Sequence, residues 1–524
     1  MRASVALTLA LVGCAGWGNL PTQSDTNIND RLWDPSGAVA RVDGVYLPLP
    51  HAGGLVRLDA GNKNTPYVLI DIGEGRVTSV SPAPDGETLV AFVERYRCTE
   101  LDDRDKEVVN VEDCLGGNAL EIRTELSIVR DGKVQGGLDV DGAYNRVTYA
   151  EDGRFGIAWF EIDGDDGPIN SVINLTSVVA LDLVEETTTP ISVGFATDRI
   201  LFVEGADGAA SQAVVLSQNS VALIDLQSDP PRKDVTFPLT LDPDQVVDPI
   251  GVDLTPDGRY ALITVDGSAD LYALDLVNRS INIVELAGKP SDMRVNDLQD
   301  RTVLVYGRTA AVDVLDHTFF DVETFDLDEP MDHIEATDAF AVLWADDGHD
   351  VYRLDLTDDS LVEYRLQNPA VDMFIAPGER FAVALTRPEN GFGDGAEGLY
   401  DRNPGMEILD LEGDDSQPFL LEGMGLGIAF ADVGDALYAL LLQEGVDYLY
   451  QLDLYTGQAE EVKLAEPPVA IGAMADGTFF ITHDLPLGLV SFWDPSTGKV
   501  VEVGGFASVS IADLIEVETS GGQR

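Results

Sequence analysis

Carboxylates at alternating positions in a glycine-bearing segment are the first feature of this chain that could do chemistry. Glu161, Asp163 and Asp165 stand at every second position of the stretch Glu-Ile-Asp-Gly-Asp-Asp-Gly. Calcium prefers hard oxygen donors, and carboxylates on a flexible loop supply them. The segment is therefore a candidate calcium site.

The same segment resembles the start of an EF-hand loop, with two departures. Asp166 stands where that loop has glycine, and no glutamate follows at the spacing that the motif requires. The chain also contains 93 Asp and Glu residues, so a cluster of this kind arises by chance. A solvated acidic loop without a metal remains the alternative.

A second polar insertion, residues 389–405, interrupts one of the repeated segments described below. It contains Phe392, Tyr400 and Arg402, and these side-chain types are enriched at the energetic centres of protein interfaces. Long loops on a rigid scaffold often carry function. We predict a recognition loop here, with a disordered surface insertion as the alternative.

Catalytic motifs are absent from the sequence. It has no Gly-x-Ser-x-Gly elbow, no His-Glu-x-x-His, no glycine-rich phosphate loop and no Cys-x-x-Cys pair. For each of the five scattered histidines we expect a turn or surface role, with a ligand role as the alternative. They are His51, His317, His333, His349 and His483.

The N-terminal residues carry an export signal. Arg2 precedes a short apolar run, residues 5–12, which is too short to span a bilayer. The stretch Leu11-Val-Gly-Cys14 resembles the bacterial lipobox, which implies that Cys14 becomes diacylated and N-terminal. Ala15 follows it, and by resemblance to enterobacterial sorting this favours the outer membrane. An ordinary signal peptide with an incidental cysteine is the alternative.

The two remaining cysteines, Cys98 and Cys114, share a charged insertion at residues 95–117. Exported chains meet an oxidising compartment, where two nearby cysteines most simply form a disulfide. In the entropic account, closing such a loop is worth roughly 3 kcal/mol. A metal site would need further ligands, and no histidine lies near them in sequence.

Charge excludes one class of partner. The chain has 32 Lys and Arg residues against 93 Asp and Glu, a formal net charge of −61, and only 7 of the 32 are lysine. Such a surface repels phosphate backbones, and its densest basic pair, Arg232-Lys233, is flanked by Asp229 and Asp234. We therefore expect no nucleic-acid binding. The same composition suits high salt, where carboxylate repulsion is screened; an acidic proteome or a solubility device is the alternative.

A sequence motif repeats along the body of the chain, and the elements that it predicts must position the candidate sites described above. Pro256-Asp-Gly-Arg leads into short runs of β-branched and aromatic residues separated by turn residues, which predicts consecutive strands. An aspartate ends the third strand of each unit, and from Asp182 onward these are 43, 50, 41, 39, 55, 43 and 41 residues apart. We place these aspartates at positions 59, 131, 182, 225, 275, 316, 355, 410, 453 and 494.

This period with four short strands per unit predicts an all-β fold, a β-propeller, rather than an array of β-sandwiches. The repeated motif resembles those of the YVTN-type and WD-repeat-like propellers of bacterial surface and periplasmic proteins. Asp453-Leu-Tyr-Thr-Gly457 and Asp494-Pro-Ser-Thr-Gly498 are also similar to a turn of quinoprotein-type propellers. We expect about seven to ten four-stranded blades, in one ring or two, closed by N- and C-terminal strands in one blade.

The expected organisation is a lipoprotein signal peptide (1–13), a flexible tether from the lipidated cysteine (14–43), the propeller (44–517) and a tail (518–524). We expect a protein-binding or scaffold module of the cell envelope, on the periplasmic face or the cell surface. It resembles in plan the propeller lipoprotein of outer-membrane assembly. Its partner would be an envelope or extracellular protein, and the lipid anchor its only membrane contact. The alternative is a channel enzyme, either a calcium-dependent lactonase-like hydrolase or a quinoprotein-type oxidoreductase. Quinone enzymes bury their cofactor among aromatic and basic groups and a calcium ion, and the sequence shows no such group of residues. We therefore expect no cofactor, with calcium as the alternative.

Overall fold

The computed structural model describes most of the chain between residues 32 and 508. The described residues are 32–33, 38–41, 44–49, 54–58, 67–73, 75–98, 107–108, 120–140, 144–162, 173–205, 208–240, 246–296, 298–389, 395, 397–413, 415–474, 476–483, 489–503 and 507–508. Cys14, Cys114, Asp163, Asp165, Phe392 and His51 lie outside them. Among the residues that are described, no helix has the length and apolar character needed to cross a membrane.

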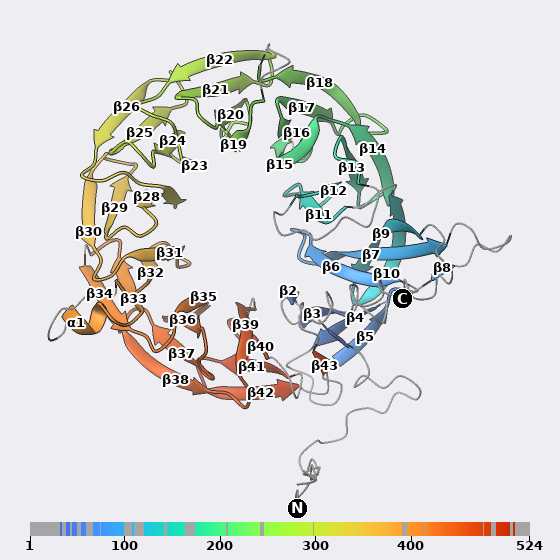
Figure 1. The fold of residues 1–524 in the computed structure, drawn as a ribbon. Coiled ribbons are helices and arrows are strands. Elements are labelled where there is room, and N and C mark those ends of the chain that lie inside the picture. Colours follow the sequence, from blue (N-terminus) through green and yellow to red (C-terminus); the bar gives the residue numbers. More distant parts are fainter. Residues whose placement is uncertain are drawn as a thin grey trace, which may run out of the picture.

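Ten antiparallel sheets of four main strands form one ring, with the first strand of each sheet innermost and the fourth on the perimeter (Figure 1). Blades 1 to 5 are built from β2 (Val39–Arg41), β3 (Gly44–Leu49), β4 (Gly54–Leu58) and β5 (Tyr67–Asp71); β6 (Arg76–Pro82), β7 (Thr88–Cys98), β9 (Leu120–Arg130) and β10 (Lys133–Val140), with β8 (Glu107–Val108) added beside β7; β11 (Arg146–Tyr149), β12 (Phe155–Trp159), β13 (Ser177–Asp182) and β14 (Thr187–Ser192); β15 (Phe195–Glu204), β16 (Ala210–Gln218), β17 (Ser220–Asp225) and β18 (Arg232–Pro238); and β19 (Pro249–Leu254), β20 (Tyr260–Val265), β21 (Asp270–Asp275) and β22 (Ser280–Glu285).

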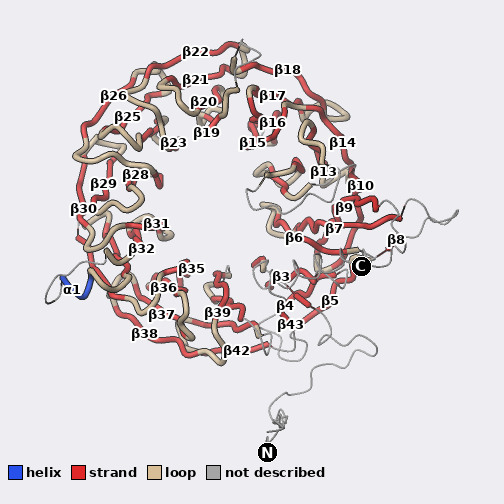
Figure 2. The backbone as a smooth tube through the Cα atoms, viewed as in Figure 1, coloured by secondary structure: helices blue, strands red, loops and turns tan. Residues whose placement is uncertain are grey.

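Blades 6 to 10 repeat the pattern. They are built from β23 (Asp292–Asn296), β24 (Arg301–Val305), β25 (Ala311–Asp316) and β26 (Val322–Asp326); β27 (His333–Ala336), β28 (Phe340–Trp344), β29 (Asp350–Asp355) and β30 (Leu361–Arg365); β31 (Ala370–Ile375), β32 (Phe381–Thr386), β33 (Gly405–Asp410) and β34 (Asp415–Leu420), with the helical turn α1 (Glu397–Tyr400) between β32 and β33; β35 (Gly425–Val433), β36 (Ala436–Gln443), β37 (Tyr448–Asp453) and β38 (Gln458–Lys463); and β39 (Pro468–Ala473), β40 (Phe479–His483), β41 (Val490–Asp494) and β42 (Lys499–Val503). Strands dominate the backbone, and α1 is its only described helix (Figure 2). The β-propeller prediction is confirmed, as a single ring with ten blades.

The predicted aspartates mark these blades. Eight of the ten end the third strand of blades 3 to 10, Asp131 directly follows β9 in blade 2, and Asp59 lies outside the described residues. Asp275 shows the reason, since its Oδ1 accepts the backbone N–H groups of Val277 and Asn278 at 3.0 and 2.7 Å. An aspartate that satisfies the amides of the next turn favours that turn over a continued strand. Burial opposes ionisation of Asp275, but hydrogen bonds from Asn278 and Arg259 hold its pKa to about 2.

The arginine of the repeated Pro-Asp-Gly-Arg motif contacts both the strand that follows it and the aspartate that ends the third strand. Arg259 lies over the ring of Tyr260 at 4.9 Å and donates from Nη2 to Asp275 at 3.1 Å. The same arrangement recurs in blades 3 and 8, where the arginine, aromatic ring and aspartate are Arg154, Phe155 and Asp182, and Arg380, Phe381 and Asp410. The arginine of the motif therefore connects the start of the second strand to the end of the third strand of its own blade.

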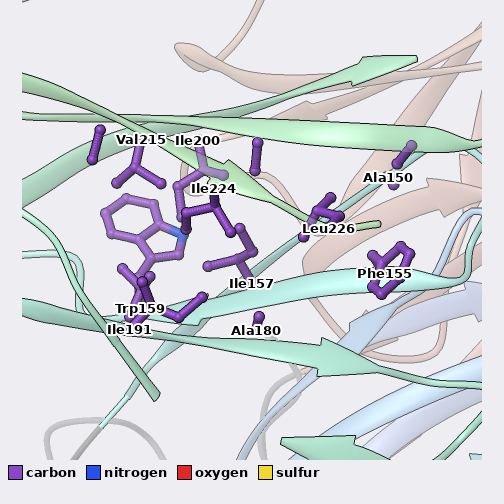
Figure 3. Packing of buried hydrophobic residues seen from close by; sticks show 14 residues of the cluster. Ala150, Phe155, Ile157, Trp159, Ala180, Ile191, Ile200, Val215, Ile224 and Leu226 are labelled. Carbon is purple, nitrogen blue, oxygen red and sulfur yellow. The ribbon is translucent and has the colours of Figure 1, made fainter. Parts of the chain in front are cut away.

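One buried apolar cluster lies at each of the ten interfaces between neighbouring blades, within the described part of the chain. Figure 3 shows the cluster between blades 3 and 4, where Trp159 packs beside Ile200 and Val215. The Trp159 indole N–H donates to Thr148 Oγ1 at 3.1 Å, so its one polar atom is satisfied. The core of the molecule is thus a ring of contacts between neighbouring sheets.

The expected closure of the ring within one blade is wrong. Blade 1 takes all four strands from the N-terminal side and blade 10 all four from the C-terminal side. Val39–Arg41 already supplies the innermost strand of blade 1, so no place is left for a C-terminal strand, and the propeller begins before the expected boundary at residue 44. Outside the blades, β1 (Leu32–Trp33) instead pairs in parallel with β43 (Ala507–Ser508).

Strand direction divides the connections between two faces. In each blade the innermost strand starts, and the second and fourth strands end, on one face, which we call the loop face. The connections from second to third strand therefore all lie there. The long ones, in blades 2, 3 and 8, span residues 99–119, 160–176 and 387–404. All the insertions singled out from the sequence leave the propeller on the loop face.

Candidate binding surface on the loop face

A buried amide holds the described part of the blade 8 insertion. Asn368, in the connection that enters β31, is 1% exposed. Its Nδ2 donates to the backbone oxygens of Tyr400 and Asn403 at 2.9 and 3.0 Å. Asn403 in turn donates from Nδ2 to the backbone oxygen of Leu399 at 2.8 Å. These bonds connect the helical turn α1 to the body of the propeller.

The start of the insertion is tied to blade 7. His349 Nε2 lies 2.6 Å from Glu389 Oε1, and its Nδ1 lies 3.1 Å from the backbone oxygen of Leu366. Arg387 forms an ion pair with Asp347, 2.6 Å between Nη2 and Oδ1. Both ends of the insertion are therefore anchored, and His349 has a loop-holding role.

Two of the three predicted recognition residues lie beside these anchors. Arg402 is exposed and Tyr400 is half-buried, and the neighbouring Leu399 is an exposed apolar side chain that the sequence did not single out. Phe392 lies outside the described residues. The described part thus presents an aliphatic, an aromatic and a guanidinium group on one turn, residues 397–403, which the bonds from Asn368 hold in place. We call it the clamped turn.

The candidate calcium segment is described only at its first two residues, Glu161 and Ile162. Glu161 Oε2 accepts a hydrogen bond from Arg146 Nε, and its backbone N–H donates to Asn145 Oδ1 at 2.7 Å. Asp163 and Asp165 lie outside the described residues. Across the part of the chain that is described, no three His, Cys, Asp or Glu side chains are grouped to hold a metal ion.

The cysteine predictions are not tested here. Cys98 is the last residue of β7, where it pairs with Leu120 of β9. Its side chain, Cys114 and Cys14 lie outside the described residues. The disulfide and the lipid anchor stay predictions.

Carboxylates on the innermost strands join neighbouring blades, and sequence reasoning did not single them out. Asp253 on β19 accepts the backbone N–H of Val295 in blade 6 at 3.2 Å. Asp292 on β23 accepts the N–H of Ile334 in blade 7 at 3.0 Å. Each bond spans 42 residues, about one blade repeat, which is the signal that could have revealed them.

A cluster of titratable side chains lies near Asp292, in blades 6 to 8. Burial raises the pKa of Glu335, the nearby Arg294 and His333 lower it, and Asp292 and Asp372 raise it further. Arg294 Nη1 donates to Asp292 Oδ1 at 2.8 Å, and His333 stacks on Trp344 at 4.2 Å while its Nε2 lies 3.2 Å from Asp346. The groups here are largely paired with one another.

The other described histidines also have structural partners. His317 Nε2 lies 2.7 Å from Thr302 Oγ1. His483 is fully buried between the backbone oxygen of Glu466 and the Ser491 hydroxyl, each 2.8 Å away, and burial lowers its pKa. The expected turn or surface role is wrong for His483, because this imidazole holds the connection into blade 10 from inside.

A cleft of about 570 Å³ opens on the face opposite the loop face, between blades 4 and 5. Arg259 and Arg279 line it together with Glu204 and Asp257. Both arginines are already paired, Arg259 with Asp275 and Arg279 with Asp234 at 2.5 Å. Their charge is offset within the protein, so the cleft does not form a strong anion site.

No protein-family model matches the chain, and no curated protein matches it. Solved structures do. The chain is similar to dihydro-heme d1 dehydrogenase NirN in complex with DHE (13% identity, TM-score 0.39, 63% of this chain and 71% of that chain). It is also similar to a eukaryotic initiation factor (11%, 0.45, 77% and 90%) and to apo AztD from Citrobacter koseri (14%, 0.35, 64% and 92%). At these identities the likeness concerns the β-propeller fold alone.

Proposed function

We propose that this chain is a lipid-anchored cell-envelope protein that binds another envelope or extracellular protein through the loop face of its propeller. Cys14 would carry the lipid. The observation that supports binding is the clamped turn of blade 8, where buried Asn368 holds the backbone beneath exposed Leu399 and Arg402.

Clamping matters because ordering a loop on binding costs free energy. A turn that is already held by hydrogen bonds loses less conformational freedom when a partner docks, so more of the contact energy appears as affinity. Tyr and Arg are also the side chains most enriched among energetic centres of interfaces. A scaffold with a pre-ordered recognition element is what this geometry supports best.

Three substitutions on this turn test the proposal. Leu399→Ser, Tyr400→Ser and Arg402→Ser together leave Asn403 and the backbone oxygens that Asn368 binds in place. We expect the variant to stay folded and its partner affinity to fall at least about tenfold. The measurement is quantitative capture of crosslinked partners from native envelopes, with circular dichroism as the folding check. Deleting residues 390–403 would be less clean, because it removes the Tyr400 and Asn403 acceptors of a buried amide.

The matched control carries Val277→Ser and Phe319→Ser, two exposed apolar side chains in turns of the opposite face. It should capture the same partners as the unaltered chain. Equal partner lists for the loop variant and the unaltered chain would refute a binding role for this turn. Turnover in a hydrolase panel that survives in both variants would instead support the channel-enzyme alternative.

A further inference from the structure

A β-bulge recurs where the innermost strands begin on the loop face. In blade 9, Gly425 pairs with Gln443 and Gly427 with Leu442, so Leu426 is the extra residue between two consecutive partners. The same register shift leaves Ile250, Val371 and Val469 as the extra residue in blades 5, 8 and 10. A bulge of this kind re-aims side chains and locally interrupts the ladder.

The residue type at this bulge differs between blades. In blades 3, 4, 6 and 7 the equivalent residue is polar: Asn145, Asp198, Ser291 and Asp332. It is apolar in blade 5 (Ile250) and in the three consecutive blades 8, 9 and 10. We call Val371, Leu426 and Val469 the apolar arc.

The apolar arc faces solvent. Leu426 is 59% exposed, and Val371 and Val469 are each 38% exposed. The polar residues at the same position in blades 3, 4, 6 and 7 show that the fold does not require an apolar side chain there. Neighbouring exposed apolar residues on an otherwise charged surface mark interaction sites.

Carboxylates flank the centre of the arc. Residues 421–424 and 444–447, the two loops beside the start of β35, contain Glu422, Glu444 and Asp447 and no Lys or Arg. All three carboxylates are exposed, and the loops are joined by a bond of 2.8 Å from Glu444 N to Met424 O. Asp372, also exposed, directly follows Val371.

We propose that the apolar arc and these carboxylates dock a cationic amphipathic segment of the partner protein. Aliphatic side chains of that segment would cover the arc, and its Lys or Arg residues would meet Glu422, Glu444, Asp447 and Asp372. This inference rests on the proposed function and names the chemistry of its partner.

The charge of the protein decides against other occupants. A second copy would bring another net charge of −61 to the interface, and an anionic membrane surface or nucleic acid would be repelled for the same reason. An acidic or neutral peptide would satisfy the arc but leave the carboxylates uncompensated. A positively charged segment satisfies both parts of the surface.

A designed peptide tests the arc directly. The probe is a fluorescent helix-forming peptide of Leu and Lys, about 18 residues or roughly five turns long, and the comparison peptide has Glu in place of Lys. We expect saturable binding of the Lys peptide by fluorescence anisotropy, and none of the Glu peptide. Val371→Ser, Leu426→Ser and Val469→Ser together should weaken binding at least about tenfold, while Ile283→Ser on the outer strand β22, where Ile283 is 64% exposed, should not.

A second pair of variants separates local from overall charge. Glu422→Gln with Glu444→Gln should weaken binding more than Glu185→Gln with Glu412→Gln, which removes two exposed carboxylates from turns of the opposite face. Unchanged affinity of the arc variant, or equal effects of the two charge pairs, would overturn the proposal and leave bulk attraction. Capture by the blade 8 turn is measured independently, so it can succeed where the arc fails, and the reverse.

Discussion

Replacing Phe492 by alanine is expected to lower the free energy of unfolding by about 3–5 kcal/mol, the usual cost of emptying a buried phenylalanine site. Phe492 on β41 is 1% exposed in the cluster that joins blade 10 to blade 1, where it packs with Val45 and Leu47. Blades 1 and 10 are the first and last blades along the chain. Among the residues that the structure describes, the ring is closed there by the short pair of β1 with β43 and by side-chain packing. The loss of stability should therefore be concentrated at the interface between blades 1 and 10, which we call the seam of the ring.

Hydrogen exchange and urea unfolding check this expectation together. Protection should fall first in β2–β5 and β39–β42, since the seam opens before the other interfaces. Phe319→Ala is the control, because Phe319 is 75% exposed and its loss should change stability by no more than about 0.5 kcal/mol. A uniform loss of protection over all ten blades would show that the seam is no weaker than the rest.

Lowering the salt concentration is expected to lower Tm strongly. The chain carries a net charge of −61, and the Debye length grows from about 3 Å at 1 M salt to about 30 Å at 0.01 M. Carboxylates on neighbouring blades then repel each other unscreened. Salt also weakens the favourable arginine–aspartate pairs, but 32 basic residues cannot offset 93 acidic ones.

Thermal unfolding followed by circular dichroism from about 0.01 to 1 M salt measures this effect. NaCl and KCl at equal ionic strength should give the same curve if screening is the cause. A Tm that stays flat over this range would contradict adaptation to high salt and leave the fold assignment untouched.

The propeller could be predicted because its signals are local. An aspartate such as Asp275 bonds amides two and three residues ahead, so its spacing records the end of a strand without any knowledge of the fold. The closure of the ring was missed because Val39–Arg41 is only three residues long and stands in a polar stretch. No periodicity identifies a strand of that length.

The candidate surface could be predicted only in part. Tyr400 and Arg402 were found from residue type within a long polar insertion, which is a local property. The hydrogen bonds by which Asn368 holds the blade 8 turn, and those by which Asp253 and Asp292 join neighbouring blades, link residues 32 to 42 positions apart in sequence. The apolar arc depends on a register shift, which composition does not reveal.

Site-specific photo-crosslinking in intact cells tests the central claim, binding of a protein at the loop face, most directly. A photoreactive amino acid is placed at position 402 on the blade 8 turn or, for comparison, at position 277 on the opposite face, in the full chain with Cys14 intact. The account predicts a discrete protein adduct from position 402 and none of comparable yield from position 277. An adduct from position 277 alone, or no protein adduct at position 402, would contradict it.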